Sequence, residues 1–295
     1  MSAPTVSLLL MLPALLLLAS VFLYPLLRYG WLSLQASSVL TGLVPVPNGG
    51  ANWGRLLDDA RFWTDAGQTL RFALCSVSLE LLGGLALALL LHRPLRGRGP
   101  LRALTLLPWA LPTTVMALGW RWILNDPHGP INAAIRSLGG SSYGFLSTPA
   151  TTWFFVVLAD VWKTMPFVAL LLLAGLQTIP VDLEEALRLE GASRLQILRR
   201  LTLPLLVPYL TLALLFRLAQ ALGVFDLIQV LTGGGPAGST ESLALYAYLN
   251  AMRFLDFGYA STVMLATFLL LLVSLGGGWL LLRRHGQGHA TERAA

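Results

Sequence analysis

Six runs of apolar residues, each long enough to cross a lipid bilayer, constrain this chain more than any other feature. A bilayer core needs about 20 helical residues per crossing, and it admits only helices or closed barrels because backbone polar groups must be satisfied there. The runs are rich in consecutive Leu and Ala and lack the alternation of a barrel strand. The sequence therefore predicts an all-α membrane protein with six transmembrane helices in a single domain over residues 1–295. The predicted spans cover about 8–27, 72–91, 103–122, 152–176, 202–224 and 257–282.

The composition agrees with a fold in which water is not the main solvent. Only 12% of the residues are charged and 56% are hydrophobic, whereas soluble domains carry about 25% charged residues. The net charge of +6 could indicate a nucleic-acid partner. However, all but one of the 20 Lys and Arg residues are Arg, and they are scattered over short connections between apolar runs. We interpret them as signals of membrane topology instead.

The distribution of arginine predicts the orientation in the membrane. The connections 92–102, 178–201 and 283–295 hold eleven arginines, whereas the remaining connections, which together are about twice as long, hold six. Cytoplasmic loops carry the excess of basic residues. We therefore expect these three segments and both termini to be cytoplasmic. The stretch before Arg28 has no basic n-region of a secretory signal, so we expect the first apolar run to be retained as a span.

One inner connection, 178–204, is too polar to span a membrane and too patterned for a linker. Asp182 stands where it can cap a helix, with Glu185 at the N3 position of a capping box. Gly191 can end that helix, because glycine adopts the left-handed conformation at the lowest cost. Ser193, with glutamine three residues later, repeats the capping signal. The pattern predicts two short helices joined at Gly191, the second ending near residue 200.

The first of these helices has an apolar stripe with helical spacing, formed by Leu183, Ala186 and Leu187. Such a stripe fits a helix that lies on the lipid surface, and it equally fits a helix that binds another protein. The glycine between the two helices favours the second interpretation.

Segment 185–204 resembles the EAA loop of binding-protein-dependent ABC importer permeases. That pattern is Glu-Ala-Ala, three residues, Gly, nine residues, then Ile-x-Leu-Pro. The chain departs from it mildly at three positions, Leu187, Glu190 and Leu201. In the family this loop docks on a cytoplasmic ATPase. The resemblance implies that ATPase coupling involves Glu184, Glu185, Ala186, Gly191, Ala192, Leu203 and Pro204.

Further blocks resemble the maltose-type carbohydrate permeases over nearly the whole chain. These blocks are 22–27, 52–63, 93–112, 120–125, 160–167 and 224–236. The resemblance implies a sugar permease in a bacterial or archaeal cell (inner) membrane. It also implies a second homologous permease subunit, two ATP-binding-cassette ATPase subunits and an extracytoplasmic sugar-binding protein as partners.

The chain itself lacks the residues for ATP hydrolysis. A Walker A loop needs a Gly-Lys-Ser/Thr run, and the single lysine, Lys163, lies inside a predicted span. The sequence also offers no nucleophile constellation and no histidine or cysteine spacing typical of a metal site. We therefore predict no enzyme activity and no cofactor for this chain, with ATP and magnesium bound by the partner ATPase.

Four charged residues fall inside predicted spans and away from their ends, namely Glu80, Asp160, Lys163 and Arg217. Such residues usually face the bundle interior or a water-filled path. Asp160 and Lys163 share a helix face and could pair, and Glu80 and Arg217 could approach each other. For all four residues two interpretations remain open. Each can pair or pack within the helix bundle, or it can line the translocation path.

The segment TGGGP includes Gly233, Gly234, Gly235 and Pro236 on the predicted outer side. It is most simply a turn, but a binding protein could also dock there.

A secondary transporter driven by an ion gradient is the alternative function, with Glu80, Asp160 and Lys163 as coupling groups. Those folds often contain internal repeats, and none is visible in this sequence.

Overall fold

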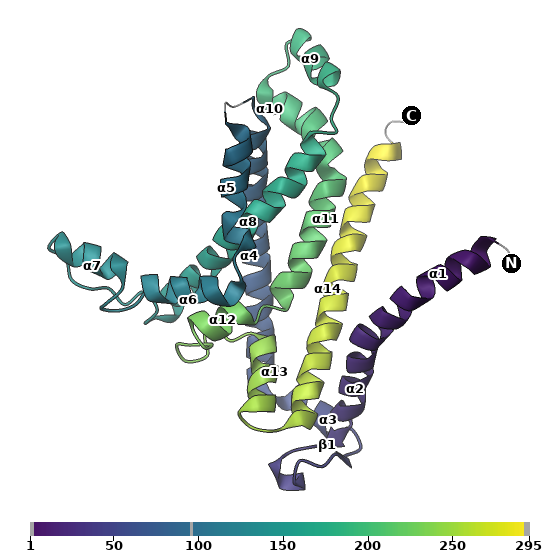
Figure 1. The fold of residues 1–295 in the computed structure, drawn as a ribbon, viewed down its shortest axis with the longest axis vertical. Helices are drawn as coiled ribbons and strands as arrows, with labels where there is room; N and C mark the ends of the chain where they lie inside the picture. The colour runs from purple at the N-terminus through teal and green to yellow at the C-terminus, as the bar shows by residue number, and fades with distance from the viewer. Residues whose placement is uncertain (1–2, 95–96, 292–295) are drawn as a thin grey trace. The chain divides into compact units, whose positions relative to one another are not determined.

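The computed structural model describes residues 3–94 and 97–291. Their contacts separate the chain into two compact units, which are described one at a time; Figure 1 labels their helices. Unit 1 comprises Met1–Ala66 and Leu243–Leu270, and unit 2 comprises Gly67–Ser242 and Leu271–Ala295. The single-domain organisation stays a prediction. The predicted inner segments include residues 95–96 and 292–295, which lie outside the described residues.

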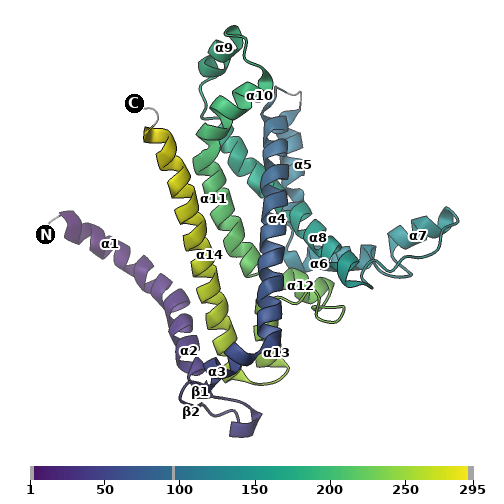
Figure 2. The same cartoon turned by 180° about the vertical axis from the view of Figure 1, so that it is seen from behind.

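The elements are nearly all helical, and the only described strands form a short ribbon near the N-terminus, visible in Figure 2. Unit 1 holds α1 (Ala3–Leu18), a π-helical turn (Ala19–Leu23), α2 (Tyr24–Ser33), β1 (Gln35–Ala36), a 3-10 turn (Val39–Thr41), β2 (Val46–Pro47), α3 (Ala51–Asp58), α13 (Leu243–Met252) and the beginnings of α4 (Ala60–His92) and α14 (Phe257–Thr291). Unit 2 holds the rest of α4 and α14, with α5 (Arg98–Ala110), α6 (Thr113–Ile123), α7 (Pro130–Ser137), α8 (Pro149–Leu176), α9 (Val181–Leu189), α10 (Arg194–Ile197), a π-helical turn (Leu198–Thr202), α11 (Leu203–Leu222) and α12 (Asp226–Leu231).

Among the described residues, five helices are long and apolar enough to cross a membrane, and a sixth span results if a bent pair counts as one. The five are Leu10–Ser33, Ala60–His92, Pro149–Leu176, Arg194–Leu222 and Phe257–Gly277. The predicted all-α membrane fold is confirmed. The span predicted at 202–224 begins earlier, at Arg194, because α10, the π-helical turn and α11 form one continuous helix.

The third predicted span is broken rather than straight. Helices α5 and α6 meet at an angle of 89°. Leu111, which precedes Pro112, has an extended backbone with ψ 136°, because the proline ring disfavours the α conformation of the residue before it. Pro112 also has no amide hydrogen to continue the ladder. The break therefore lies at Pro112, whereas Pro108 of the same run is accommodated inside α5.

In unit 2, helix α8 packs closely against α4 and against α11, and a glycine lies at each of these two contacts. A Cβ atom added at Gly84 of α4 would lie 2.6 Å from Val168 Cγ1 of α8. A Cβ atom added at Gly175 of α8 would lie 2.6 Å from the ring of Tyr209 in α11. Since lipid supplies no hydrophobic force between helices, close packing of this kind holds membrane helices together. These contacts fix the three helices that carry the buried charges described below.

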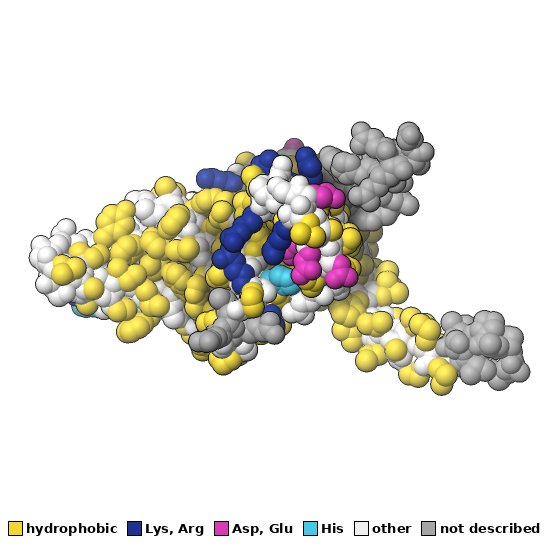
Figure 3. Space-filling view, turned by 90° about the horizontal axis from the view of Figure 1, so that it is seen from above, with side chains coloured by type: hydrophobic (Ala, Val, Ile, Leu, Met, Phe, Trp, Pro, Cys, Tyr) yellow, Lys and Arg dark blue, Asp and Glu magenta, His cyan; other side chains and the backbone are white. Residues whose placement is uncertain are grey.

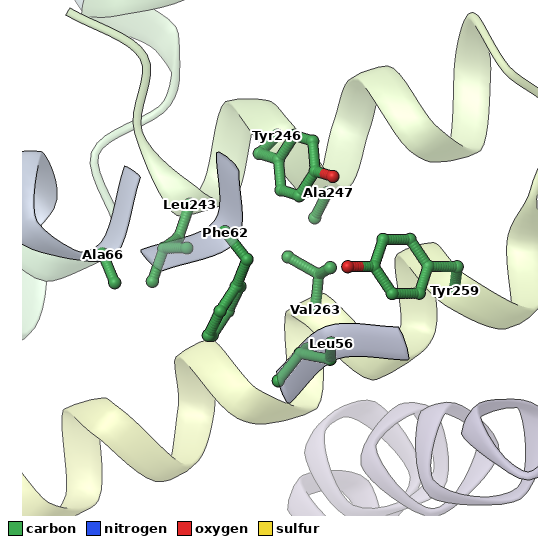
Figure 4. Packing of buried hydrophobic residues seen from close by; sticks show 8 residues of the cluster. All are labelled: Leu56, Phe62, Ala66, Leu243, Tyr246, Ala247, Tyr259 and Val263. Atoms are coloured by element: carbon green, nitrogen blue, oxygen red, sulfur yellow. The ribbon is translucent and has the colours of Figure 1, made fainter. Parts of the chain in front are cut away.

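The core of unit 1 joins α3, the first turns of α4 and α14, and α13. Figure 4 shows the packed side chains, with the hydroxyl groups of Tyr246 and Tyr259 pointing into a common space. Both hydroxyls donate to Asp59 Oδ2. The other oxygen of Asp59 accepts the backbone amides of Arg61 and Phe62, at 2.9 and 3.3 Å. Asp59 therefore caps α4 and ties α13 and α14 to its start.

These contacts predict a pH dependence for unit 1. Burial alone would raise the pKa of Asp59, but hydrogen bonds from Tyr246, Tyr259, Phe62 and Arg61 hold that pKa below its ordinary value. A carboxyl with a depressed pKa stabilises the fold above its unfolded pKa of about 3.9, and that stability is lost as the pH falls through the folded pKa. We expect Asp59→Asn to destabilise the purified protein at pH 7.

The measurement is thermal unfolding of wild type and Asp59→Asn between pH 7 and pH 3. The difference between the two proteins should shrink as the pH falls. Asp58→Asn, which changes an exposed neighbour, serves as the control. A difference that is independent of pH would contradict the role of the ionised carboxylate.

Candidate functional site

Three membrane helices of unit 2 bring the predicted intramembrane charges together in a buried ion-pair network formed by Glu80, Asp160 and Arg217. Arg217 Nη2 of α11 donates to Glu80 Oε1 of α4 at 2.8 Å and to Asp160 Oδ2 of α8 at 3.1 Å. Arg217 Nε also donates to Glu80 Oε2. Glu80 is 0% exposed and Arg217 is 2% exposed. Of the two alternatives left open for Glu80 and Arg217, the structure shows the close approach, and a place on the translocation path stays a prediction.

Two hydroxyl groups complete the buried ion-pair network. Ser76 Oγ lies 2.9 Å from Glu80 Oε1 and 2.6 Å from Asp160 Oδ2. Thr164 Oγ1 lies 2.6 Å from Glu80 Oε1 and 2.6 Å from the backbone oxygen of Asp160. Glu80 Oε1 and Asp160 Oδ2 thus each have a hydroxyl neighbour in addition to Arg217 Nη2, and a buried polar group in a membrane interior is usually bonded in this way.

Lys163 does not pair with Asp160, contrary to one of the expected arrangements. Its Nζ atom lies 3.5 Å from the backbone oxygen of Trp109 in α5, while Asp160 pairs with Arg217. Residues 160 and 163 share a face of α8, but the closer and more buried guanidinium of Arg217 takes the carboxylate. Lys163 is left facing an open space between the helices.

That space is a cleft of about 250 Å³, and the buried ion-pair network forms part of its wall. Charged side chains, an amide and aromatic rings all reach it. The lining residues from α5, α6 and α8 are Trp109, Thr113, Asp160, Lys163 and Thr164, and those from α11, α12 and the turn between them are Arg217, Gln220, Ala221, Gly223, Val224, Phe225, Asp226 and Leu227. A concave site with a few convergent polar groups is the usual form of a small-molecule site.

The 89° bend between α5 and α6 places residues of both helices in this wall. Gln220 is oriented from behind, since Arg217 Nη1 donates to its side-chain oxygen. Gln220 therefore presents its amide group toward the cleft with one of its hydrogen-bonding positions already occupied. The cleft can offer hydrogen-bond donors and acceptors together with the ring of Trp109, which stacks on Phe167 at 5.3 Å between ring centroids.

A second candidate site is α9 with the turn that follows it. Gly191 adopts a left-handed conformation with φ 83°, as expected. The Ser193 capping box is also present, with Gln196 N donating to Ser193 Oγ and Ser193 N donating to Gln196 Oε1. The helix start differs from the prediction: Pro180 occupies the N-cap position, and Asp182 lies in the first turn without capping it.

The second short helix is not separate either, because α10 continues into α11. Capping signals identify where a helix begins, but the apolar run that follows prolongs this one into the membrane. Glu184 pairs with Arg188 one turn later. Of the other residues predicted for coupling, Glu185, Ala186, Gly191 and Pro204 are exposed, and Ala192 and Leu203 are partly buried.

The surface of α9 mixes apolar and charged side chains. Leu183 is 47% exposed and Leu189 is 90% exposed. Figure 3 looks onto this end of unit 2, where Lys and Arg side chains gather beside Asp and Glu side chains. An exposed helix with large apolar side chains and charged neighbours is suited to a protein interface.

The TGGGP segment is a compact turn at the end of α12. Gly233 and Gly234 have positive φ values of 63° and 87°. Thr240 Oγ1 donates to the backbone oxygen of Gly235 at 2.9 Å, and Thr232 and Thr240 hydroxyls lie 2.9 Å apart. The turn is thus internally bonded, and a docking role for Gly233, Gly234, Gly235 and Pro236 stays a prediction.

Besides Thr113 of the cleft wall, sequence reasoning missed four polar residues of the membrane site. Two of them had a signal, since Ser76 precedes Glu80 by four residues and Thr164 follows Asp160 by four, which places each on the same helix face as a buried acid. Gln220 and Asp226 had no comparable signal. Their place in the cleft depends on how α11 and α12 meet.

The chain belongs to the family described as binding-protein-dependent transport system inner membrane component, whose model matches residues 80–282. It is 43% identical over 264 residues to the trehalose/maltose transport system permease protein MalF of Thermococcus litoralis, covering 90% of this chain and 89% of that protein. It is 37% identical to the sulfoquinovosyl glycerol transport system permease protein SmoG of Agrobacterium fabrum, covering 89% and 85% of the two chains.

A further relative is the trehalose transport system permease protein SugA of Mycobacterium tuberculosis, with 35% identity over 87% of this chain and 81% of that protein. Among solved structures, one chain of a bacterial ABC transporter involved in the import of the acidic polysaccharide alginate superposes with a TM-score of 0.81. The match covers 93% of this chain and 94% of the alginate-transporter chain at 20% sequence identity. It shows that the two chains share a fold. The protein is therefore a multi-span permease, a translocation subunit.

Proposed function

We infer that this chain is one permease subunit of an ATP-driven importer that carries a carbohydrate into the cytoplasm. The observation that carries this proposal is the 43%, 37% and 35% identity, over most of both chains, to three permeases named for sugar or sugar-derivative transport. The cleft beside the buried ion-pair network is the proposed place of passage. Its amide, carboxyl, ammonium and aromatic groups are of the kinds that bind sugar hydroxyls and sugar faces.

Coupling to ATP hydrolysis is assigned to α9 and Gly191. Support comes from the exposed apolar side chains of this helix and from its continuity, through Gly191 and α10, with the membrane helix α11. The proposed assembly holds a second homologous permease, two ATPase subunits and an extracytoplasmic sugar-binding protein. ATP and magnesium belong to the ATPase subunits, because the single lysine of this chain lies in α8 and cannot form a Walker A loop.

Reconstitution in liposomes tests the proposal. The complete importer, made with its partner permease, ATPase and binding protein, should accumulate radiolabelled sugar only when ATP is present on the ATPase side. Uptake by this chain alone, driven by an imposed proton or sodium gradient without ATP, would contradict the proposal and support a secondary transporter.

The proposed orientation predicts opposite sidedness for two exposed serines of unit 2. In a Cys75→Ser background, which removes the single native cysteine, cysteine is introduced at Ser193 after α9 or at Ser141 after α7. We expect a membrane-impermeant thiol reagent to label Ser141→Cys from outside intact cells and Ser193→Cys only after permeabilisation. Labelling of both from the outside would overturn the orientation derived from the arginine distribution.

A further inference from the structure

The buried ion-pair network has an excess of acidic groups. Two carboxyl groups, Glu80 and Asp160, surround one guanidinium, that of Arg217. If both acids were ionised, the network would carry a net negative charge inside the membrane-spanning part of unit 2. Uncompensated buried charge costs several kcal/mol, so a bare excess charge at this depth is not expected to persist.

The nearest additional charges do not remove this excess. The cleft wall also contains Lys163 from α8 and Asp226 from α12, and these two have opposite signs. Lys163 Nζ is directed to the Trp109 backbone oxygen. When Glu80, Asp160 and Asp226 are all ionised, these three acids outnumber the two cations, Arg217 and Lys163, by one negative charge.

The hydrogen bonds of Ser76 point to the same conclusion. Its hydroxyl oxygen lies 2.9 Å from Glu80 Oε1 and 2.6 Å from Asp160 Oδ2. A hydroxyl has one proton to donate, and ionised carboxylates only accept. A single hydroxyl proton cannot be donated fully to both carboxyl groups, so a proton held by one of the two acids would complete this pair of contacts.

We propose that Asp160 is a neutral carboxylic acid in the folded protein, with its proton on Oδ2 donated to Ser76 Oγ while Ser76 donates to Glu80 Oε1. Asp160 is assigned the proton because Glu80 receives two donors of Arg217, from Nε and Nη2, whereas Asp160 receives one, at 3.1 Å. The ionised pair is then Glu80 with Arg217. The network becomes electroneutral, and Asp160 presents an uncharged group to the cleft.

This protonation state also defines the kind of ligand that the cleft wall fits. With Asp160 neutral, Lys163 balances Asp226 and Arg217 balances Glu80, so the wall carries no net charge. A wall without net charge does not favour an ionic ligand over an uncharged sugar, so sugar hydroxyls and sugar faces compete there without a Coulomb disadvantage. This last step rests on the proposed function, whereas the protonation of Asp160 does not.

Infrared spectroscopy of the purified full-length chain tests the proposal without any transport assay. At neutral pH, exposed carboxyls with pKa values of about 4 are ionised, and a protonated carboxyl shows a separate carbonyl stretch. We expect such a band, shifted when the protein is labelled with carboxyl-¹³C aspartate, lost in Asp160→Asn and retained in Asp58→Asn. Glu80→Gln should also abolish the band, because Asp160 would then become the counter-ion of Arg217.

A band that is missing from the wild type, or that survives Asp160→Asn, would overturn the proposal while leaving the importer function intact. A second readout uses stability. Asparagine reproduces the neutral acid, so Asp160→Asn should unfold within a few degrees of wild type, whereas Asp160→Leu, which leaves Ser76 without its donor, should unfold at a lower temperature. Equal loss in both variants would show that the negative charge of Asp160 is required.

Discussion

Replacing Arg217 by methionine should destabilise the protein by about 3–5 kcal/mol, the usual cost of removing one partner from a buried ion pair. Methionine keeps much of the side-chain length but leaves Glu80, which is 0% exposed, without its counter-ion. It also releases Gln220, whose oxygen accepts from Arg217 Nη1. We expect a large drop in the yield of folded protein and in the unfolding temperature measured in detergent.

The controls separate the ion pair from general damage to α11. Arg199→Met changes an exposed arginine in the same continuous helix and should leave stability unchanged. The double variant Glu80→Leu/Arg217→Met removes both members of the pair and should recover much of the loss, since apolar replacements of buried ion pairs are often tolerated. Wild-type stability in Arg217→Met would show that the pair does not hold α4 to α11.

Replacing Gly191 by valine is expected to lower sugar-stimulated ATP hydrolysis of the assembled importer by at least tenfold. The φ angle of Gly191 is 83°, and a β-branched residue is a genuine outlier in that region. Nothing lies within 4 Å of the position that its Cβ would occupy, so the effect would come from the backbone and not from a clash. Relaxation of the turn would move α9 relative to α10.

Gly139→Val provides a matched control, because Gly139 has a φ of 84° and equally open surroundings but follows α7. Both variants carry the same conformational strain, and only the one at Gly191 should affect ATP hydrolysis. Equal activity of the two variants would contradict the coupling role of the α9–α10 turn.

The extent to which the sequence predicts this protein depends on the range of the interactions involved. The spans were predictable because each follows from about 20 consecutive residues and the requirement that backbone groups be satisfied in lipid. The conformation of Gly191 and the Ser193 capping box were predictable for a similar reason, since three or four neighbouring residues determine them.

Features that depend on neighbours distant in the chain were predicted less well. The charged residues inside the spans were found, and pairing of Asp160 with Lys163 on the same helix face was one of the alternatives, whereas the structure pairs Asp160 with Arg217, 57 residues away. The 89° break at Pro112 was missed, because proline within an apolar run can kink a helix or end it, and the surrounding helices decide which. The place of Asp226 in the cleft depends on how two helices meet, which no local pattern contains.

The continuous helix Arg194–Leu222 connects the two candidate sites. Its 29 residues, at 1.5 Å each, give a length of about 43 Å. Arg217 and Gln220 lie near the C-terminal end of this helix, and the Gly191 turn precedes its N-terminal end. The π-helical turn Leu198–Thr202 and Pro208 both interrupt its regular α-helical hydrogen bonding, so a twist applied at α10 would be divided between these two places and a rotation of Gln220 within the cleft wall.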